Sequence, residues 1–290
     1  MTAESWEQNW YYSALFFLFI ALAFYGALII KPNPRFKEGG WGCVVLSCLC
    51  LIASLFVRSQ NAQYFALSNM YESLLTVSIG IHLAFLTLDR WFNLKLLGLP
   101  VICLLLFSLF YNLQLPTEIH PLQPALQSYW RSIHVPIILL SYALFTLSFI
   151  SAIVFLIKDA LEPKYQPITE NFTLMLGAGG MPERQEFAKL YDEITYRCIA
   201  FGVPLLTLGI ILGGMWANEA WGNYWSWDPK ESMSLVTLLG YGVYLHMRVS
   251  ESYSAKVLAW VSVIGFMLML ITYFGVNLMG VGLHSYGKIG

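Results

Sequence analysis

Long apolar runs dominate this chain, and short polar connections separate them. Most runs approach the roughly 20 apolar residues that a helix needs to cross the hydrocarbon region of a membrane. They are too long and too evenly apolar for the alternating strands of a membrane barrel, so they predict helices. The pattern predicts about eight transmembrane helices, over residues 11–30, 41–57, 68–88, 94–113, 134–157, 194–215, 229–247 and 257–279.

Composition agrees with a membrane protein. Of the residues, 58% are hydrophobic and 11% are charged, whereas about 25% are charged in an ordinary soluble domain. The net charge of −1 gives no reason to expect nucleic acid as a partner. The first run is too long for a signal-peptide core, and no Lys or Arg precedes Lys31, so we expect a retained helix. The expected fold class is an all-α, polytopic integral membrane protein in which residues 1–290 form one domain.

Basic residues predict the orientation in the lipid bilayer. With eight helices the loops alternate between the two sides, and twelve of the sixteen Lys and Arg residues fall on one side. By the positive-inside rule that side is cytoplasmic or stromal, and it includes the connection 158–193. We therefore expect both termini and the segments 114–133 and 216–228 on the periplasmic or lumenal side.

Tryptophan is concentrated in one outer connection. Residues 216–231 read WANEAWGNYWSWDPKE, with four Trp and one Tyr in the first twelve positions. One interpretation is an aromatic belt at the membrane interface, which would spread such residues over both faces. Their concentration in one loop favours a second interpretation, a surface on which a flat, apolar ligand stacks.

The end of this stretch also has a structural explanation. Asp228 is well placed as the N-cap of the seventh helix, with Pro229 at the first helical position and Glu231 at the third. This is the pattern of a capping box. A fixed helix start is compatible with ligand binding, because it would hold the tryptophan-rich loop in place.

Two histidines flank this loop on the same side of the membrane. His134 begins the fifth helix and His284 follows the eighth. Either one alone is usually an ordinary interfacial residue. Together, beside an aromatic surface, they suggest the axial ligands of a heme iron. Three residues on that side could pair with the heme propionates, namely Arg58, Arg131 and Lys230.

Other ionisable residues fall within the expected helices. His246 lies near the inner end of the seventh helix, where an ionisable group is a functional candidate, although a neutral imidazole bonded to a neighbouring helix explains it equally well. His82 lies at a comparable depth and could pair with it. Glu72 opens the third helix, close enough to the outer surface to be solvated. We interpret His120, in an outer loop, as structural.

The sequence resembles the CcsA (ResC-type) family of the system II cytochrome c biogenesis pathway, found in plastids, cyanobacteria and other bacteria. The resemblance is strong over 130–290 and looser over 1–129. It rests on the tryptophan-rich "WWD" signature at 216–231 and on the segments 69–73, 130–135, 140–142, 244–248, 275–277 and 282–287. Heme handlers of another biogenesis system share the WWD signature, so it indicates heme handling more firmly than the pathway.

The resemblance implies two heme sites. His134 and His284 would ligate the iron at an outer site, above a surface formed by Trp216, Trp221, Trp225, Trp227 and Asp228. His246 would be a ligand within the membrane at an inner, heme-receiving site. In the family the opposite ligand of that inner site belongs to the Ccs1 (ResB-type) partner subunit, which puts a pairing of His246 with His82 in doubt.

The expected function is that of a subunit of the system II cytochrome c synthase. It would receive heme b, deliver it to the periplasmic or lumenal face and present it to apocytochromes c. No catalytic residue is assigned, and whether this chain is itself the heme lyase stays open. None of the five cysteines forms a C-x-x-C pair, so thiol reduction needs other proteins.

Two alternative functions and two membranes stay open. The chain could be a bis-histidine heme b electron-transfer protein, or a solute transporter that binds no heme. The membrane could be the thylakoid of a cyanobacterium or plastid, or a bacterial plasma membrane.

Overall fold

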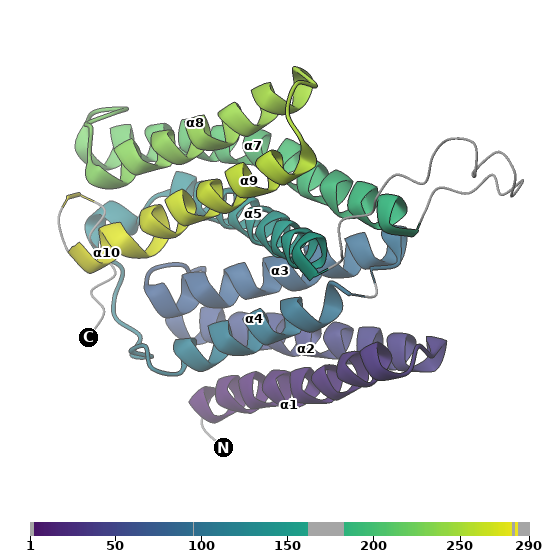
Figure 1. Cartoon of the computed structure of the whole chain (residues 1–290). Helices are drawn as coiled ribbons and strands as arrows, with labels where there is room; N and C mark the ends of the chain where they lie inside the picture. The colour runs from purple at the N-terminus through teal and green to yellow at the C-terminus, as the bar shows by residue number, and fades with distance from the viewer. Residues whose placement is uncertain (1–2, 95, 162–182, 280–281, 284–290) are drawn as a thin grey trace, which may run out of the picture.

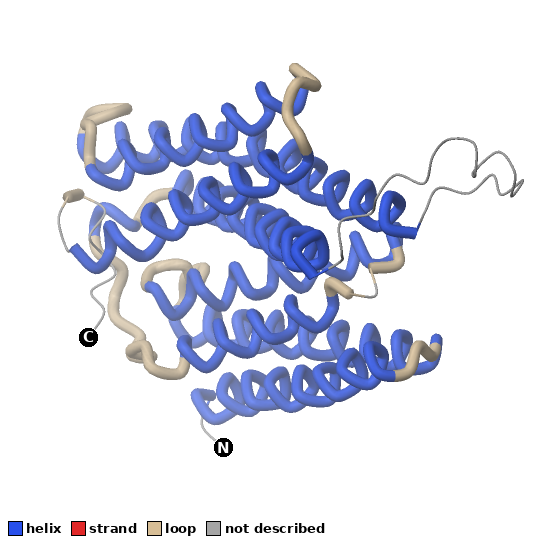
Figure 2. Tube along the Cα trace, in the orientation of Figure 1, coloured by secondary structure: helices blue, strands red, loops and turns tan. Residues whose placement is uncertain are grey.

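The computed structural model describes residues 3–94, 96–161, 183–279 and 282–283, and within these residues it contains helices and short connections but no strand (Figure 2). Every run that the sequence analysis expected to be a helix is one. The helices are α1 (Ala3–Ile30), α2 (Pro34–Ala62), α3 (Met70–Phe92), α4 (Gly98–Asn112), η1 (Pro124–Leu126), α5 (Tyr129–Leu161), α7 (Glu183–Trp221), α8 (Pro229–Val249), α9 (Ala255–Leu270), the π-helical turn η2 (Ile271–Gly275) and α10 (Val276–Met279).

Six of these helices are long and apolar enough to cross a membrane, namely α1, α2, α3, α5, α7 and the α9–η2 segment. Helix α4 is apolar but has only 15 residues, and α8 has 21 residues with a more polar sequence. The prediction of an all-α, polytopic integral membrane protein is therefore confirmed.

Helix α5 is central in the bundle. It packs along α7 on one side and contacts α3 and α9 on others, whereas α1 and α2 pair at the edge of the molecule (Figure 1). Since His134 lies on the second turn of α5, the fold places this imidazole between the N-terminal helices and the group formed by α7, α8 and α9.

Glycines allow α5 and α7 to pack closely. A Cβ atom built at Gly202, Gly209 or Gly213 of α7 would overlap a side chain of α5. At Gly213 it would lie 2.6 Å from Cε1 of His134. Small residues at such positions are a common basis of helix association in membranes. They fix the register of this pair and bring the His134 ring against the α7 backbone.

Among the helix ends that differ from the expected ones, two bear on the site. Helix α5 begins at Tyr129 rather than at residue 134, and α7 continues to Trp221 rather than ending at residue 215. Trp216 and Trp221 are therefore helical, and the loop proper spans 222–228. Gly222 ends α7 because it has a left-handed φ of +79°, which glycine adopts at little cost. Of the connection 158–193, residues 162–182 lie outside the described part of the chain.

Candidate functional site

The His134 imidazole is fixed by a neighbouring helix. Its Nδ1 lies 2.6 Å from the carbonyl oxygen of Gly209, and its ring stacks on Trp216 with centroids 6.0 Å apart and planes 23° apart. A carbonyl only accepts hydrogen bonds, so Nδ1 carries the proton and the lone pair of the neutral ring lies on Nε2. A hydrogen bond of this kind commonly orients a metal-binding histidine. The geometry therefore suits an iron ligand that acts through Nε2.

The four tryptophans of the WWD segment do not form one flat surface. Trp216 is only 3% exposed, its Nε1 donates to the carbonyl of Ala125 at 2.8 Å, and its ring packs 5.0 Å from that of Trp221. Trp225 and Trp227 form a separate T-shaped pair with centroids 5.7 Å apart. Trp227 is 71% exposed. Trp216 is thus buried, Trp225 is half-buried, and Trp227 lies on the outer surface.

A cavity of about 180 Å³, part of it open to solvent, lies beside these groups. It is bordered by α3, α5, α7 and α8 and by the η2–α10 segment. His134, Trp216 and Trp225 line it together with apolar and hydroxyl side chains. The structure therefore brings His134 and two of the four predicted tryptophans to one cavity.

The predicted capping box at the start of α8 is confirmed. Asp228 accepts from the backbone N–H of Lys230 at 3.0 Å, and Glu231 accepts from the backbone N–H groups of Asp228 and Ser226. The other carboxylate oxygen of Asp228 accepts from the backbone N–H of Leu283 at 2.5 Å. Asp228 therefore joins the tryptophan-rich loop to the segment after α10. His284 itself lies outside the described residues.

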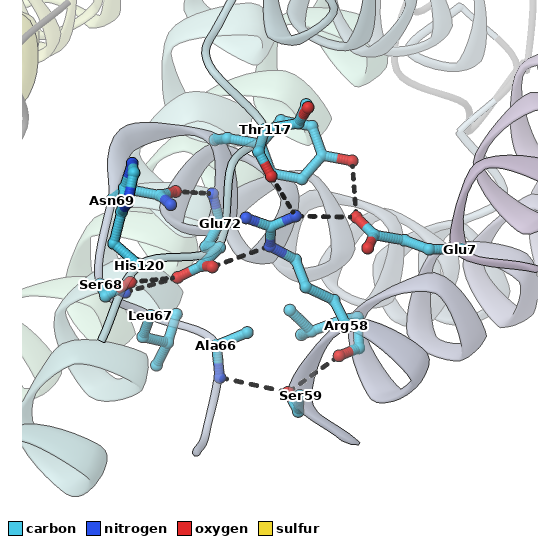
Figure 3. A network of polar contacts seen from close by, with 12 residues as sticks. Glu7, Arg58, Ser59, Ala66, Leu67, Ser68, Asn69, Glu72, Thr117 and His120 are labelled. Atoms are coloured by element: carbon cyan, nitrogen blue, oxygen red, sulfur yellow. Dashed lines mark hydrogen bonds and ion pairs between the residues drawn. The ribbon is translucent and has the colours of Figure 1, made fainter. Parts of the chain in front are cut away.

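The expectation that Arg58 faces a heme propionate was wrong. Arg58 is 1% exposed, and its guanidinium donates to Glu72 at 2.7 Å and to Glu7 at 3.1 Å (Figure 3). It also donates to the carbonyl of Thr117 at 3.1 Å. Glu72 is completely buried rather than solvated. The sequence analysis missed Glu7, because nothing near residue 7 indicates that α1 places its carboxylate beside Arg58.

The two other cations border the cavity but differ in their bonds. Arg131 is 3% exposed and donates to the carbonyls of Leu126 at 2.8 Å and Leu67 at 3.1 Å. The Nζ of Lys230 donates to the side-chain oxygen of Asn277 at 3.0 Å. Arg131 thus fastens neighbouring loops to α5, whereas Lys230 presents its ammonium group beside a single amide.

The remaining histidines lie in three different environments. His82 is completely buried, with Nδ1 2.7 Å from the carbonyl of Ser78 and Nε2 3.1 Å from the hydroxyl of Ser47. Because both ring nitrogens are engaged, His82 does not pair with His246. His246 is exposed on α8. His120 is exposed in the loop before η1, 3.4 Å from Glu118, as expected for a residue without a role in the site.

Sequence reasoning did not identify the residues that position the site. Gly209 supplies the carbonyl for His134, Gly213 makes room for its ring, and Asn277 holds Lys230. The glycines carry a weak signal, since Gly202, Gly209 and Gly213 recur at spacings of seven and four along α7 and so share one helical face. The sequence around Asn277 gives no indication of its role.

Comparisons with known proteins agree with this architecture. The family model described as "Cytochrome C assembly protein" matches residues 67–284. The "Cytochrome c biogenesis protein CcsA" of Guillardia theta is 36% identical, with 92% of this chain and 91% of that protein covered. The protein of the same name from Crocosphaera subtropica is 34% identical, with 99% and 98% covered.

A solved structure shares the fold. "Cytochrome c Heme Lyase CcmF" aligns with a TM-score of 0.65 at 16% identity, over 100% of this chain and 52% of that one, so this chain spans about half its length. At this identity the likeness concerns the fold alone. The family model and the curated relatives show that this chain is a CcsA-type member of the cytochrome c assembly protein family, and thus a membrane protein of cytochrome c biogenesis.

Proposed function

We propose that this chain presents heme b for covalent attachment to apocytochromes c, with His134 and His284 as the axial ligands of the iron at the outer site. The observation that carries the proposal is the His134 imidazole, which Gly209 orients and Trp216 stacks against at the edge of a cavity. The backbone N–H of Leu283 donates to Asp228, so the chain up to the residue before His284 reaches the same loop.

The lining of the cavity suits a heme. A porphyrin is flat and apolar, and Trp216, Trp225 and Tyr224 offer aromatic area for it. The charged side chains that line the cavity among the described residues are Arg131, Lys230 and Glu231, a net charge of +1 with a neutral His134. A ferric heme with two ionised propionates carries a net charge of −1. Cavity and ligand are therefore complementary in charge.

We place an inner, heme-receiving site at His246, from which heme passes to the outer site. The exposed face of α8 carries Val236, Leu239 and Val243, and His246 continues this apolar stripe. An imidazole that faces lipid is unfavourable, so a neighbouring subunit that covers it is the better explanation. We propose that the Ccs1 (ResB-type) partner covers this face and supplies the opposite ligand. The outer site then lies on the periplasmic or lumenal side. The cyanobacterial and plastid relatives favour the thylakoid membrane.

The chemistry of attachment belongs to the heme and the apocytochrome. Each thiol of a Cys-x-x-Cys-His segment adds across a vinyl group, so that sulfur bonds one vinyl carbon, hydrogen goes to the other, and no net oxidation occurs. The incoming histidine displaces one of the two ligands. Holding heme and peptide together makes the addition effectively unimolecular, which can be worth several kcal/mol, roughly 7–11 at best. The role of this chain is positioning.

The test is heme content together with cytochrome c maturation. The complex with its partner is purified after a His134→Ala change, and the visible spectrum and heme per complex are measured. We expect loss of heme at the outer site and loss of maturation. His120→Ala is the matched control, since it removes an exposed histidine that lies outside the cavity.

Unchanged heme content and unchanged maturation in His134→Ala would refute the ligand assignment. If the complex keeps its own heme while apocytochrome is matured, the electron-transfer alternative is favoured, because an electron-transfer protein does not release its heme. A complex that never contains heme would favour the transporter.

A further inference from the structure

We infer that Lys230, held in place by Asn277, binds a propionate of the heme and so determines which edge of the porphyrin enters the cavity first. The inference rests on the proposed function and specifies how that site orients its substrate. It begins from the three cations that the sequence offers on this side of the membrane.

The other two cations already hold parts of the fold together. Arg58 lies between Glu7 and Glu72 and does not line the cavity (Figure 3). The Nε, Nη1 and Nη2 atoms of Arg131 each donate to a backbone carbonyl, and these three bonds fasten the loops around the cavity to α5. Lys230 is therefore the cation that can take a carboxylate without loss to the fold.

The geometry around Lys230 fits this role. Its Nζ donates one hydrogen bond, to the side-chain oxygen of Asn277 at 3.0 Å, and that is its only hydrogen bond to the described residues. Asn277 is itself oriented, because its Nδ2 donates to the carbonyl of Tyr273 at 2.8 Å. An ammonium group has three N–H donors, so two are left for a carboxylate. A charge-assisted bond of this kind is about twice as strong as a neutral one.

The pair joins two parts of the site. Lys230 stands in the first turn of α8, between the two capping-box residues Asp228 and Glu231, and Asn277 follows the π-helical turn η2. π-Helical turns occur frequently at functional sites, where they displace side chains that an α-helix would place elsewhere. Here the turn immediately precedes the residue that holds the lysine.

Binding of a propionate at Lys230 determines where the vinyl groups, which react with the thiols, are directed. In heme b the propionates and the vinyl groups occupy opposite edges of the macrocycle. A propionate held at Lys230 therefore directs the vinyl edge away from the start of α8. The lysine thus acts as a positioning residue for the thiol addition and takes no part in bond formation.

The test compares two porphyrins in the complex with the partner subunit, in a His246→Ala background that removes the inner candidate ligand. Ferric heme and ferric heme dimethyl ester, whose propionates are neutral, are titrated while the Soret absorbance is followed. We expect the wild-type residue at position 230 to favour the free acid by about tenfold or more. We expect the Lys230→Gln protein to bind both porphyrins with the affinity that the wild-type residue gives the dimethyl ester. Lys230→Arg should restore part of the preference for the free acid.

The control is Lys256→Gln, which removes an exposed lysine outside the cavity and should leave the preference intact. Equal affinity for the two porphyrins with Lys230 present overturns the inference without the use of any variant. A Lys230→Gln protein that keeps the full preference overturns it as well. His134→Ala should lower the affinity for both porphyrins by the same factor. If it weakens neither, the ligand assignment fails, and that failure is distinct from a failure of the lysine.

Discussion

The Nδ1 of His134 on α5 lies 2.6 Å from the carbonyl oxygen of Gly209 on α7. The orientation of the proposed iron ligand is therefore a property of the α5–α7 contact rather than of α5 alone. Any change that separates these two helices should disturb the imidazole before it unfolds the protein.

A methyl group at Gly213 tests this dependence. The added Cβ of Gly213→Ala would lie 2.6 Å from Cε1 and 2.9 Å from Nδ1 of His134, so the ring must move away from Gly209. We expect heme per complex to fall severalfold while the amount of complex in the membrane stays near normal. Gly242→Ala on α8 is the control, because its Cβ would meet nothing within 4 Å. Equal heme content in the two variants would contradict the packing argument.

Removal of the α8 cap should cost stability through a known mechanism. Asp228→Ala loses the acceptor for the backbone N–H of Lys230, worth about 1 kcal/mol for a typical N-cap, together with the bond from Leu283. Asp228→Asn keeps one oxygen for the cap and should recover the part of that loss that is due to the cap. Thermal unfolding of the detergent-solubilised complex measures both. An asparagine variant as unstable as the alanine variant would show that the charge, and not the cap, is required.

The buried ion cluster at Arg58 should be the most sensitive polar site in the N-terminal helices. Arg58→Met leaves Glu7 and Glu72 buried without a cation, and such losses cost about 3–5 kcal/mol. We expect little folded protein in the membrane. Exchanging both carboxylates for Gln in the same chain should restore part of the yield.

The control for this cluster is Arg197→Ala. It removes an exposed pair with Glu193 four residues earlier, and such pairs are worth about 0.3–0.5 kcal/mol. Full yield of Arg58→Met alone would contradict the view that the two buried carboxylates need this cation.

His82 and His246 should separate stability from heme binding. His82→Phe removes an imidazole whose two nitrogens are bonded to Ser78 and Ser47, which leaves buried polar groups unpaired at a cost of about 1–3 kcal/mol. We expect a lower unfolding temperature and an unchanged heme spectrum. His246→Ala lies on the exposed face of α8 and should give the reverse result. A heme spectrum altered by His82→Phe, at full occupancy of the site, would assign His82 a role that its hydrogen bonds do not suggest.

The helices were predictable because each is decided within its own segment. Lipid offers no partner to backbone groups, so an apolar run of sufficient length becomes a helix whatever surrounds it. The cap of α8 was predictable for the same reason, since Asp228 and Glu231 are three residues apart. The boundary of α7 was less predictable, because helix propensity continues through Trp216 until Gly222 ends the helix.

The site was only partly predictable. Chemistry and placement near helix ends singled out His134, the tryptophans and Asp228, but they did not reveal that Trp216 and Trp227 face different surroundings. The assignment of Arg58 failed because its partner Glu7 is 51 residues away in sequence. The orientation of His134 depends on a carbonyl 75 residues away, and the neighbour of Lys230 lies 47 residues away.

The sequence alone determined which segments form helices, where the tryptophan-rich loop lies among them and which residue types could hold a porphyrin. Those properties follow from local hydropathy and from short-range hydrogen bonds. Only the tertiary structure decided which cation is sealed in an ion cluster, which one borders the cavity and which way the imidazole is turned. These outcomes depend on how the helices pack. Packing brings together residues that are far apart along the chain, and the sequence around one of them does not reveal the other.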